Sequence, residues 1–365
     1  MVIEPGFSGH DATNFLTCMK YYLLIPALLI GTSQLFAQGD RKDRTAVTYE
    51  EIYDEPYSVN KLFVHFQPLY GDIFASNVNA GFGIEASYYY QDKADFKAHF
   101  RKTYSQRFYD FARDLAAKTS DVDNRAEVFN YYEIGGTYHI RDFEQSSKTK
   151  MFLYKKSYKG NIWSARVPLN AEIPCKVRKI YGARLGAIVW DSSTDLTRAM
   201  QKQGLTNEDL KDEEGTGLPL TFNDGAEERT LDVFSNLSSA GGYVGGSLTW
   251  IKNVAVNFDK FEEGVDDLIF TVYADVLFAP SLDIDDVVYT SNGETRTYNV
   301  SAIDVKKFGA RVGLEGKFNR TLSWAYGGEI GYRPSIDGRT FYALLKISLP
   351  VFGTNLNYKV ESFGK

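Results

Sequence analysis

Large apolar residues recur at every second position over three consecutive stretches near the end of the chain. The stretches are separated by the turn-like segments KFNRT and RPSIDGR. In the first stretch Phe308, Val312 and Leu314 share one face, whereas Arg311 and Glu315 share the other. Because side chains on a strand alternate with a period of two, each stretch predicts a two-faced strand, and the three predict an antiparallel meander.

The same alternation recurs along most of the chain. Nine further strands are expected at 60–70, 77–91, 94–103, 127–141, 148–157, 160–173, 177–190, 240–258 and 266–279. A soluble sandwich would also alternate, but these segments are long and carry aromatic residues near their ends. They therefore predict an all-β fold: a transmembrane antiparallel up-and-down β-barrel of about twelve strands, with an apolar outer face and a polar lumen.

The connections between the expected strands fall into two sets. The short set is 92–93, 142–147, 174–176, 259–265 and 318–320, and the alternate set contains the three long segments 104–126, 191–239 and 280–302. Outer-membrane barrels have short periplasmic turns and long external loops, so this division predicts which end faces outward and places both termini in the periplasm. As an alternative, 280–302 contains a hairpin at Asn292-Gly293, which would add two strands.

The start of the chain predicts export. From Met19 it reads MKYYLLIPALLIGTSQLFAQGD, with a basic residue, a short apolar core and small residues, as in a secretory signal peptide. The expected organisation is a removed leader and signal peptide at 1–37, a polar periplasmic arm at 38–58, the barrel at 59–350, and a tail or last-strand extension at 351–365. Either Leu349 or Phe363 closes the last strand. The Tyr-rich arm plugs the lumen, binds a periplasmic partner or is disordered.

Charge and cysteine content narrow the possible functions. The formal net charge is −6, and segment 191–239 carries eleven acidic and four basic residues, a net of −7. This loop is expected to be a solvated surface, with a divalent-cation site as the alternative. The remainder is close to neutral, so no nucleic-acid partner is expected. Cys175 is alone after the leader, which excludes an internal disulfide and a cysteine-type zinc site.

Charged residues are restricted to one face of the expected strands. An arginine or lysine facing lipid at mid-depth costs about 2–4 kcal/mol, so these groups are expected to line the lumen. The candidate lumen-lining residues are Glu85, Arg101, Glu133, Arg141, Arg166, Arg184, Asp275, Arg311, Glu315, Lys317, Glu329 and Arg333. They either pair into ion bridges that fill the lumen or line a water path of mixed charge.

One specific ion pair follows from the last meander. With FNR as the turn, paired residue numbers sum to about 638, which places Arg311 opposite position 327 and Glu329 diagonal to Arg311. A long side chain reaches a diagonal neighbour across strands. We therefore expect an Arg311–Glu329 bridge within a wider network.

The sequence does not favour catalysis. A wall-embedded serine–histidine site needs an outward-facing histidine, but His65, His99 and His139 all point inward by alternation, and no G-x-S-x-G elbow occurs. No enzyme activity, cofactor or metal is expected. Segment 105–118 has helical apolar spacing and is expected to be a loop helix on the barrel mouth, with a lid or docking surface as the alternative.

The FAQ end of the signal peptide and the Gly/aromatic hairpin YGGEIGYRP are similar to those of outer-membrane β-barrels of the Bacteroidota type. The resemblance implies a bacterial outer-membrane location, with membrane lipid and lipopolysaccharide as partners and a periplasmic or outer-membrane protein as a further partner. The expected function is a narrow or gated channel for small polar solutes. The alternative is a non-conducting envelope scaffold that docks other proteins, and an outer-membrane lipid-modifying enzyme is the least favoured reading.

Overall fold

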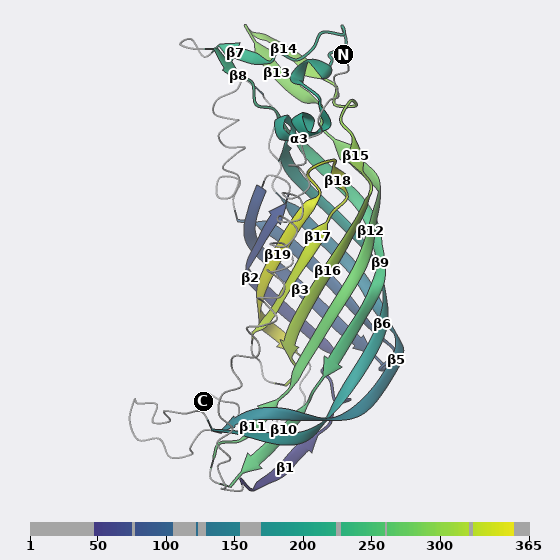
Figure 1. Ribbon diagram of the computed structural model, residues 1–365, viewed down its shortest axis with the longest axis vertical. Helices are drawn as coiled ribbons and strands as arrows, with labels where there is room; N and C mark the ends of the chain where they lie inside the picture. Colours follow the sequence, from purple (N-terminus) through teal and green to yellow (C-terminus); the bar gives the residue numbers. More distant parts are fainter. Residues whose placement is uncertain are drawn as a thin grey trace, which may run out of the picture. The chain divides into compact units, whose positions relative to one another are not determined.

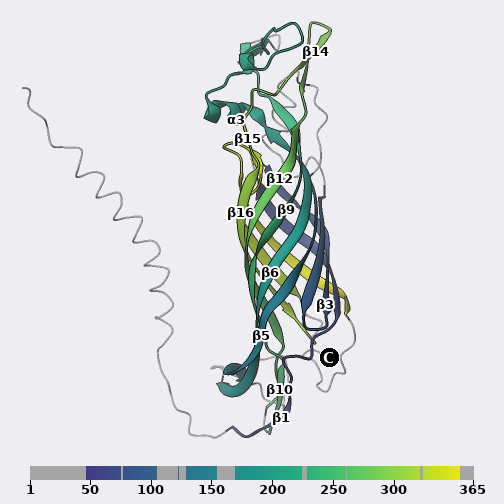
Figure 2. The same ribbon diagram turned by 90° about the vertical axis from the view of Figure 1, so that its right-hand side faces the viewer.

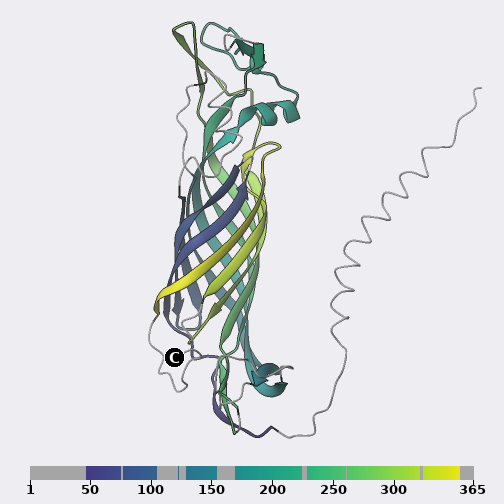
Figure 3. The ribbon, with the colours of Figure 1, turned by 90° about the vertical axis from the view of Figure 1, so that its left-hand side faces the viewer.

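The structure is a computed structural model of the chain that describes residues 47–74, 77–104, 122, 129–153, 169–223, 228–259, 261–320 and 324–353. For residues 77, 78 and 169 the backbone alone is described. Residues 49–365 form one unit, and residues 1–48 form another. Three views of the ribbon are given in Figures 1, 2 and 3.

Ten strands close into one antiparallel barrel (Figure 1). In barrel order they are β12 (Leu268–Ile284), β16 (Phe308–Phe318), β17 (Ala325–Tyr332), β19 (Phe341–Gly353), β2 (Leu62–Phe74), β3 (Asn77–Tyr90), β4 (Ala94–Thr103), β5 (Asn130–Leu153), β6 (Leu169–Asp195) and β9 (Phe234–Ile251), which pairs again with β12. The first and last strands of the barrel, β2 and β19, meet and close the ring. The all-β antiparallel barrel expected from the sequence is confirmed.

All three long connections lie at the same end of the barrel, as expected. They follow β4, β6 and β12, and because successive strands are antiparallel, these three strands end on one side. We call this side, which is uppermost in Figure 1, the upper end. The turns after β3, β9 and β16 lie at the lower end.

The expectation of twelve strands was wrong because two expected turns are strand. Residues 142–147 lie within β5 and residues 174–176 within β6, and the two strands stay paired along their whole lengths. Below Arg178, β6 no longer pairs with β9, so Pro174 lies on an edge strand, where a missing N–H is tolerated. Four expected strands are thus two strands in the structure. Because the count falls by two, the later strands keep their expected directions, and the long loops stay at one end.

The connections at the upper end fold into a structured cap. We use this name for the described residues of 196–233, 285–307 and 333–340. The cap contains α3 (Leu196–Gln203), η2 (Asn207–Asp209), β7 (Thr221–Asn223), β8 (Glu228–Thr230), β13 (Val287–Ser291), β14 (Glu294–Tyr298), β15 (Val305–Lys306) and β18 (Ser335–Ile336). Helix α3 is capped at its start by Asp195, whose carboxylate accepts a hydrogen bond from the Arg198 N–H, and at its end by Gly204, which has a φ of 76°.

The hairpin suggested for segment 280–302 is present in the cap. Strands β13 and β14 turn at Asn292 and Gly293, whose φ values of 53° and 82° are the left-handed values that an Asn-Gly hairpin turn requires. The hairpin does not add strands to the barrel, because β13 and β14 form a separate two-stranded sheet.

A second structured part lies at the lower end. Strands β1 (Tyr49–Asp54), β10 (Val254–Phe258) and β11 (Gly264–Asp266) form a three-stranded sheet next to the overhanging halves of β5 and β6. The buried side chains of this lower part include Met151 of β5, Ile173 of β6, and Val256 and Phe258 of β10. The segment 38–58, expected to be a polar arm, thus contributes strand β1 from residue 49 onward. Strand β19 runs to Gly353, and the expected tail beyond it and the expected helix at 105–118 lie outside the described residues.

The two faces of the barrel wall differ sharply in chemistry. On β6, Leu185 is 70% exposed whereas the preceding residue, Arg184, is 5% exposed, and on β19, Leu345 is 74% exposed beside buried Lys346. Apolar side chains therefore cover the outside of the wall and charged ones fill the inside. No helix among the described residues has the length and apolar composition needed to cross a membrane.

Glycines on the inner face make room for tyrosines from neighbouring strands. A Cβ at Gly186 would lie 2.5 Å from a ring carbon of Tyr243 and 2.6 Å from the Ile134 carbonyl oxygen, and a Cβ at Gly135 would meet the same ring. Each added Cβ would also meet a backbone carbonyl oxygen of the neighbouring strand, which strand pairing holds in place. The glycines therefore let Tyr243 lie flat against the wall and occupy the lumen.

We expect Gly186→Ala to lower the free energy of unfolding by about 1–3 kcal/mol, because the added methyl overpacks against Tyr243 and a backbone carbonyl. The measurement is urea unfolding in one detergent. Gly71→Ala is the matched control, since nothing lies within 4 Å of a Cβ at that exposed position. Equal stability of the two variants would contradict this account of the packing.

Candidate functional site

Ten of the twelve candidate lumen residues lie inside the barrel. They are Glu85, Arg101, Glu133, Arg184, Asp275, Arg311, Glu315, Lys317, Glu329 and Arg333, and the most exposed side chain among them, that of Glu315, is 15% exposed. The placement of Arg141 on the lumen face was wrong. A bulge between His139 and Arg141 shifts the alternation by one, so Arg141 is exposed and Asp142 turns inward. Arg166 lies outside the described residues.

Arg311 is the centre of the upper charged group. Its guanidinium donates to Glu133 Oε1 at 2.6 Å, to Asp275 Oδ2 at 2.8 Å and to Glu329 Oε2 at 3.3 Å. The other oxygen of Asp275 accepts from Arg184 Nε at 2.9 Å. One arginine thus contacts three carboxylates from three different strands, which ties opposite sides of the barrel together.

The expected Arg311–Glu329 bridge is present, but its register was wrong. Arg311 lies opposite Gly331 and Glu329 lies opposite Gly313, so paired numbers sum to 642 instead of 638. The two sums differ by four, an even number of residues, so every side chain stays on its expected face of the strand. Glu329 remains a diagonal neighbour of Arg311, displaced toward the other side.

Two further arginines complete the upper group. Arg101 pairs with Glu329 at 3.3 Å, and Arg333 pairs with Asp72 at 2.8 Å. Tyrosine rings lie against both guanidinium groups: Tyr131 is 4.0 Å from Arg101 and Tyr342 is 3.8 Å from Arg333. We call the set of Arg101, Arg184, Arg311, Arg333, Asp72, Glu133, Asp275 and Glu329 the arginine cluster.

A second group lies lower in the lumen. Lys346 Nζ donates to Glu85 Oε2 and to Glu315 Oε1, each at 2.8 Å, and Lys97 also contacts Glu315. Lys317 donates to Ser87 Oγ at 2.7 Å and lies over the Phe63 and Tyr89 rings. We call the set of Glu85, Lys97, Glu315, Lys317 and Lys346 the lysine cluster.

His99 joins the two clusters. Its ring lies between two carboxylates, 3.2 Å from Glu85 and 3.8 Å from Glu133. His139 similarly contacts Asp95 at 3.2 Å. The side chains of His65, His99 and His139 are buried inside the barrel, where His99 and His139 contact carboxylates and His139 also contacts the Asp92 carbonyl.

Sequence reasoning missed Asp72 and did not select Lys346. Asp72 follows a bulge between Gln67 and Tyr70, beyond the expected end of the strand, and the bulge reverses which face is buried. Pro68 is a signal of that bulge, since proline is tolerated in sheets at such irregularities. Lys346 shares the polar face of its strand with Tyr342, so the alternation already contained it.

The lysine cluster does not favour a metal ion. Ligand atoms of Glu85, His99 and Glu315 lie within 4.8 Å of one another, which is close enough for them to share one metal ion. Both carboxylates, however, already bind the ammonium groups of Lys97 and Lys346. A divalent ion would therefore add two uncompensated charges in a buried site.

The charges of the lumen balance. The arginine cluster has four cations and four anions. In the lower lumen, Lys97, Lys317 and Lys346 balance Glu85, Asp95 and Glu315. A cavity of about 20 Å³ bordered by the lysine cluster has room for about one water molecule. The described lumen is thus filled by side chains whose charges neutralise one another.

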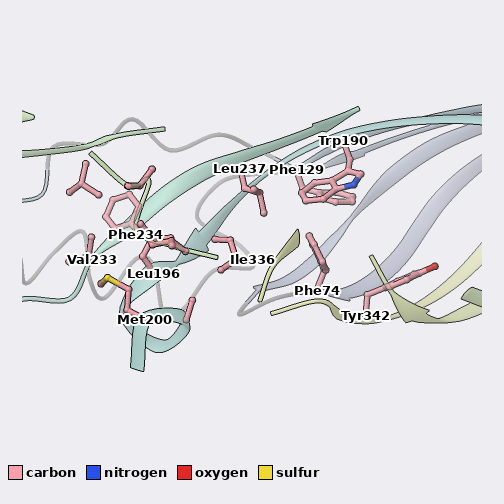
Figure 4. Close-up of a cluster of buried hydrophobic side chains, with 14 of the residues drawn as sticks. Phe74, Phe129, Trp190, Leu196, Met200, Val233, Phe234, Leu237, Ile336 and Tyr342 are labelled. Atoms are coloured by element: carbon pink, nitrogen blue, oxygen red, sulfur yellow. The ribbon is translucent and has the colours of Figure 1, made fainter. Parts of the chain in front are cut away.

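Apolar side chains close the lumen above the arginine cluster, where Arg333 lies 5.1 Å from the Phe74 ring, and Figure 4 shows this apolar group. Phe74 and Trp190 pack edge to face at 4.9 Å, and both are buried with Phe129 and Tyr342. The same buried cluster continues into the cap through Leu196, Met200 and Ile336 among others. The cap and the upper lumen therefore share one hydrophobic core.

A similar closure lies at the lower end. Phe63, Ile180, Ile251 and Ile269 come from four different strands and pack together inside the barrel, with Val59 against them. The adjoining Arg178 contacts Asp92 at 3.0 Å, bonds Asp142 and lies 4.4 Å from the Tyr57 ring. Residues before β2 thus take part in closing the lower end.

The acidic loop of the cap is partly neutralised by one arginine. Arg296 on β14 bonds Asp212 at 2.8 Å, Glu214 at 3.1 Å and Glu294. Partial burial acts to raise the pKa of Asp212, but hydrogen bonds from the Thr216 N–H and from Arg296 outweigh it, so this pKa lies below its usual value. These acids hold the cap together, which weakens the alternative of a divalent-cation site.

Comparison with protein-family models found no match, and a search of the curated proteins found no match either.

We expect Arg311→Met to lower the free energy of unfolding by about 3–5 kcal/mol, because it leaves buried carboxylates without their cation. Adding Glu329→Gln should cost less than the sum of the two single changes. The measurement is a double-mutant cycle of unfolding in one detergent.

The control is the pair Lys148→Met and Glu172→Gln, whose side chains are 72% and 66% exposed in an ion pair of 4.0 Å. Their single effects should be small and additive. Strict additivity at Arg311 and Glu329 as well would show that the buried pair is not coupled.

Proposed function

We propose that this chain is a bacterial outer-membrane β-barrel that conducts no ions and serves as an envelope scaffold. The observation that carries the proposal is the lumen: it is occupied by a charge-neutral set of paired side chains and bounded by apolar clusters at both ends. Such a barrel would serve as a membrane anchor, and its two structured ends would be available to bind other molecules.

The outer face supports the membrane location. Ile134, Leu185, Leu345 and Phe308 are between 66% and 74% exposed, and they belong to strands on different sides of the barrel. A soluble protein rarely exposes apolar surface of this extent, whereas a barrel in lipid needs it. The signal-peptide-like segment that begins at Met19 agrees with export, although it lies outside the described residues.

The lumen supports a scaffold over a channel. Ten strands enclose an interior slightly wider than the eight-stranded barrels that side chains just fill. An ion crossing it would have to separate the contacts of Arg311 and then pass the apolar layer around Trp190. Conduction therefore requires rearrangement of both the cluster and the cap, whereas anchoring requires none.

Both ends offer folded surfaces for partners. The cap has its own secondary structure and a core continuous with the barrel, and the lower sheet of β1, β10 and β11 packs beside the overhanging β5 and β6. Because these parts are folded and packed on the barrel, we expect binding to them to carry little ordering penalty. A periplasmic or outer-membrane protein is the class of partner that this arrangement suits.

We expect the purified barrel to carry no steady current in planar lipid bilayers, because its lumen is filled. Arg311→Glu tests whether any current passes the cluster, and Lys148→Glu, an exposed site outside the barrel wall, is the control. Steady current whose ion selectivity changes with Arg311→Glu alone would contradict the scaffold and support the narrow channel.

We expect Glu213→Cys in the cap to react with a membrane-impermeant maleimide on intact cells, and Lys93→Cys in a lower turn to react only after the outer membrane is opened. Both positions are exposed, and the native Cys175 is buried. Labelling of Lys93→Cys alone on intact cells would invert the proposed orientation.

A further inference from the structure

The outer wall of the barrel contains a hollow of about 420 Å³. It extends across β3, β4, β5 and β6, and outward-facing residues in two cross-strand rows border it. The upper row is Ile84, Phe100, Tyr132 and Val189, and the lower row is Ala86, Ala98, Ile134 and Ala187. The inward-facing residues His99 and Glu133 complete its floor.

Three alanines produce this hollow. Ala86 lies directly opposite Ala98, and Ala187 follows on the other side of Ile134 in the same row. Neighbouring outward positions carry much larger groups, such as Leu185, which is 70% exposed. Because the alanine methyl groups are much smaller than the surrounding side chains, they leave a depression in the wall. The lining of this depression is mainly apolar.

A cation lies directly above the hollow. Lys102 is two residues beyond Phe100 on the same face of β4, about 7 Å farther toward the upper end. Lys102 is exposed, and no ion pair joins it to a carboxylate among the residues that the structure describes. Asn130 and Asp191 continue its row, with Asp191 two strands away.

We propose that the hollow and Lys102 form a binding site for a lipid with an anionic, phosphate-bearing headgroup. One acyl chain lies in the hollow and the phosphate contacts the Lys102 ammonium. The site rests on the proposed function, because it needs the outer wall to face lipid. The Lys102 ammonium can form charge-assisted hydrogen bonds with the phosphate of the headgroup. The hollow is lined mainly by apolar groups, which make no hydrogen bonds, so it suits the acyl chain.

Other occupants match the site less well. A free phosphate ion would use Lys102 but leave the hollow unfilled. A second copy of the chain would need polar or closely matched side chains at the contact, since association of proteins within a membrane relies on hydrogen bonds and close packing. The two rows that border the hollow offer only the Tyr132 hydroxyl as a polar side-chain group.

The test is native mass spectrometry of the detergent-purified barrel titrated with phosphatidylglycerol, with phosphatidylcholine in parallel. We expect the wild type to retain one phosphatidylglycerol. Ala98→Phe should abolish this binding by filling the hollow, and Lys102→Gln should weaken it about five-fold and remove the preference over phosphatidylcholine. Millimolar inorganic phosphate should not displace the lipid.

Matched controls are Ala310→Phe, at an outward-facing alanine of β16, and Lys150→Gln, at an exposed lysine of β5. Both should bind as the wild type does. Equal retention by the wild type and Ala98→Phe, or displacement by phosphate, would overturn the lipid site while leaving the membrane barrel intact. A change of oligomeric state in Ala98→Phe without a change in bound lipid would assign the hollow to a second copy. If no variant enters lipid vesicles at all, the proposed function itself fails.

Discussion

The rest of the structure depends on one electrostatic constraint: charges inside a closed ten-stranded ring have too little space for bulk water and must solvate one another. Arg311 meets this constraint most fully, because its fork of donors reaches three carboxylates at once. Lysine could not replace it, since one ammonium cannot present donors in three fixed directions within a plane. The position of Asp275, shared between two arginines, follows from the same requirement.

Layers of different chemistry follow one another along the barrel axis. Apolar packing around Trp190 shields the arginine cluster from the upper side, and packing around Ile251 shields the lysine cluster from the lower side. Shielding raises the strength of the ion pairs by lowering the local dielectric, and the same low dielectric makes each unpaired charge costly. Stability and closure of the lumen are therefore two results of one arrangement.

The period-two pattern located the fold and most of the charged interior, because alternation is intrinsic to the strand backbone. Arg311 and Glu329 were assigned to the lumen without knowledge of their register, and an even register error did not matter. Bulges are where the pattern failed. At His139 an extra residue moved Arg141 outward, and near Pro68 another brought Asp72 inward. Bulges depend on cross-strand pairing, which a single strand's pattern does not contain.

The strand count failed for a related reason. A strand that extends beyond the barrel is exposed to solvent, as a turn is. Its polar residues and its proline therefore resemble the composition of a turn. The overhang of β5 and β6 can be recognised only once the end of the pairing between β6 and β9 is known. The lower sheet, which depends on the distant strands β1 and β10, was likewise not foreseeable from local sequence.

Closure of the barrel has a consequence for the order of folding. Arg333–Asp72 and Lys346–Glu85 each join residues 261 apart in sequence, and Lys97–Glu315 joins residues 218 apart. These bridges form only when β19 meets β2, since that pairing is what brings the two halves of the chain together. Loop closure must precede contacts of such long sequence separation, so a fold that depends on them is expected to form slowly. Since a buried charge without its partner is costly, these ion pairs favour the register in which β19 and β2 close the barrel.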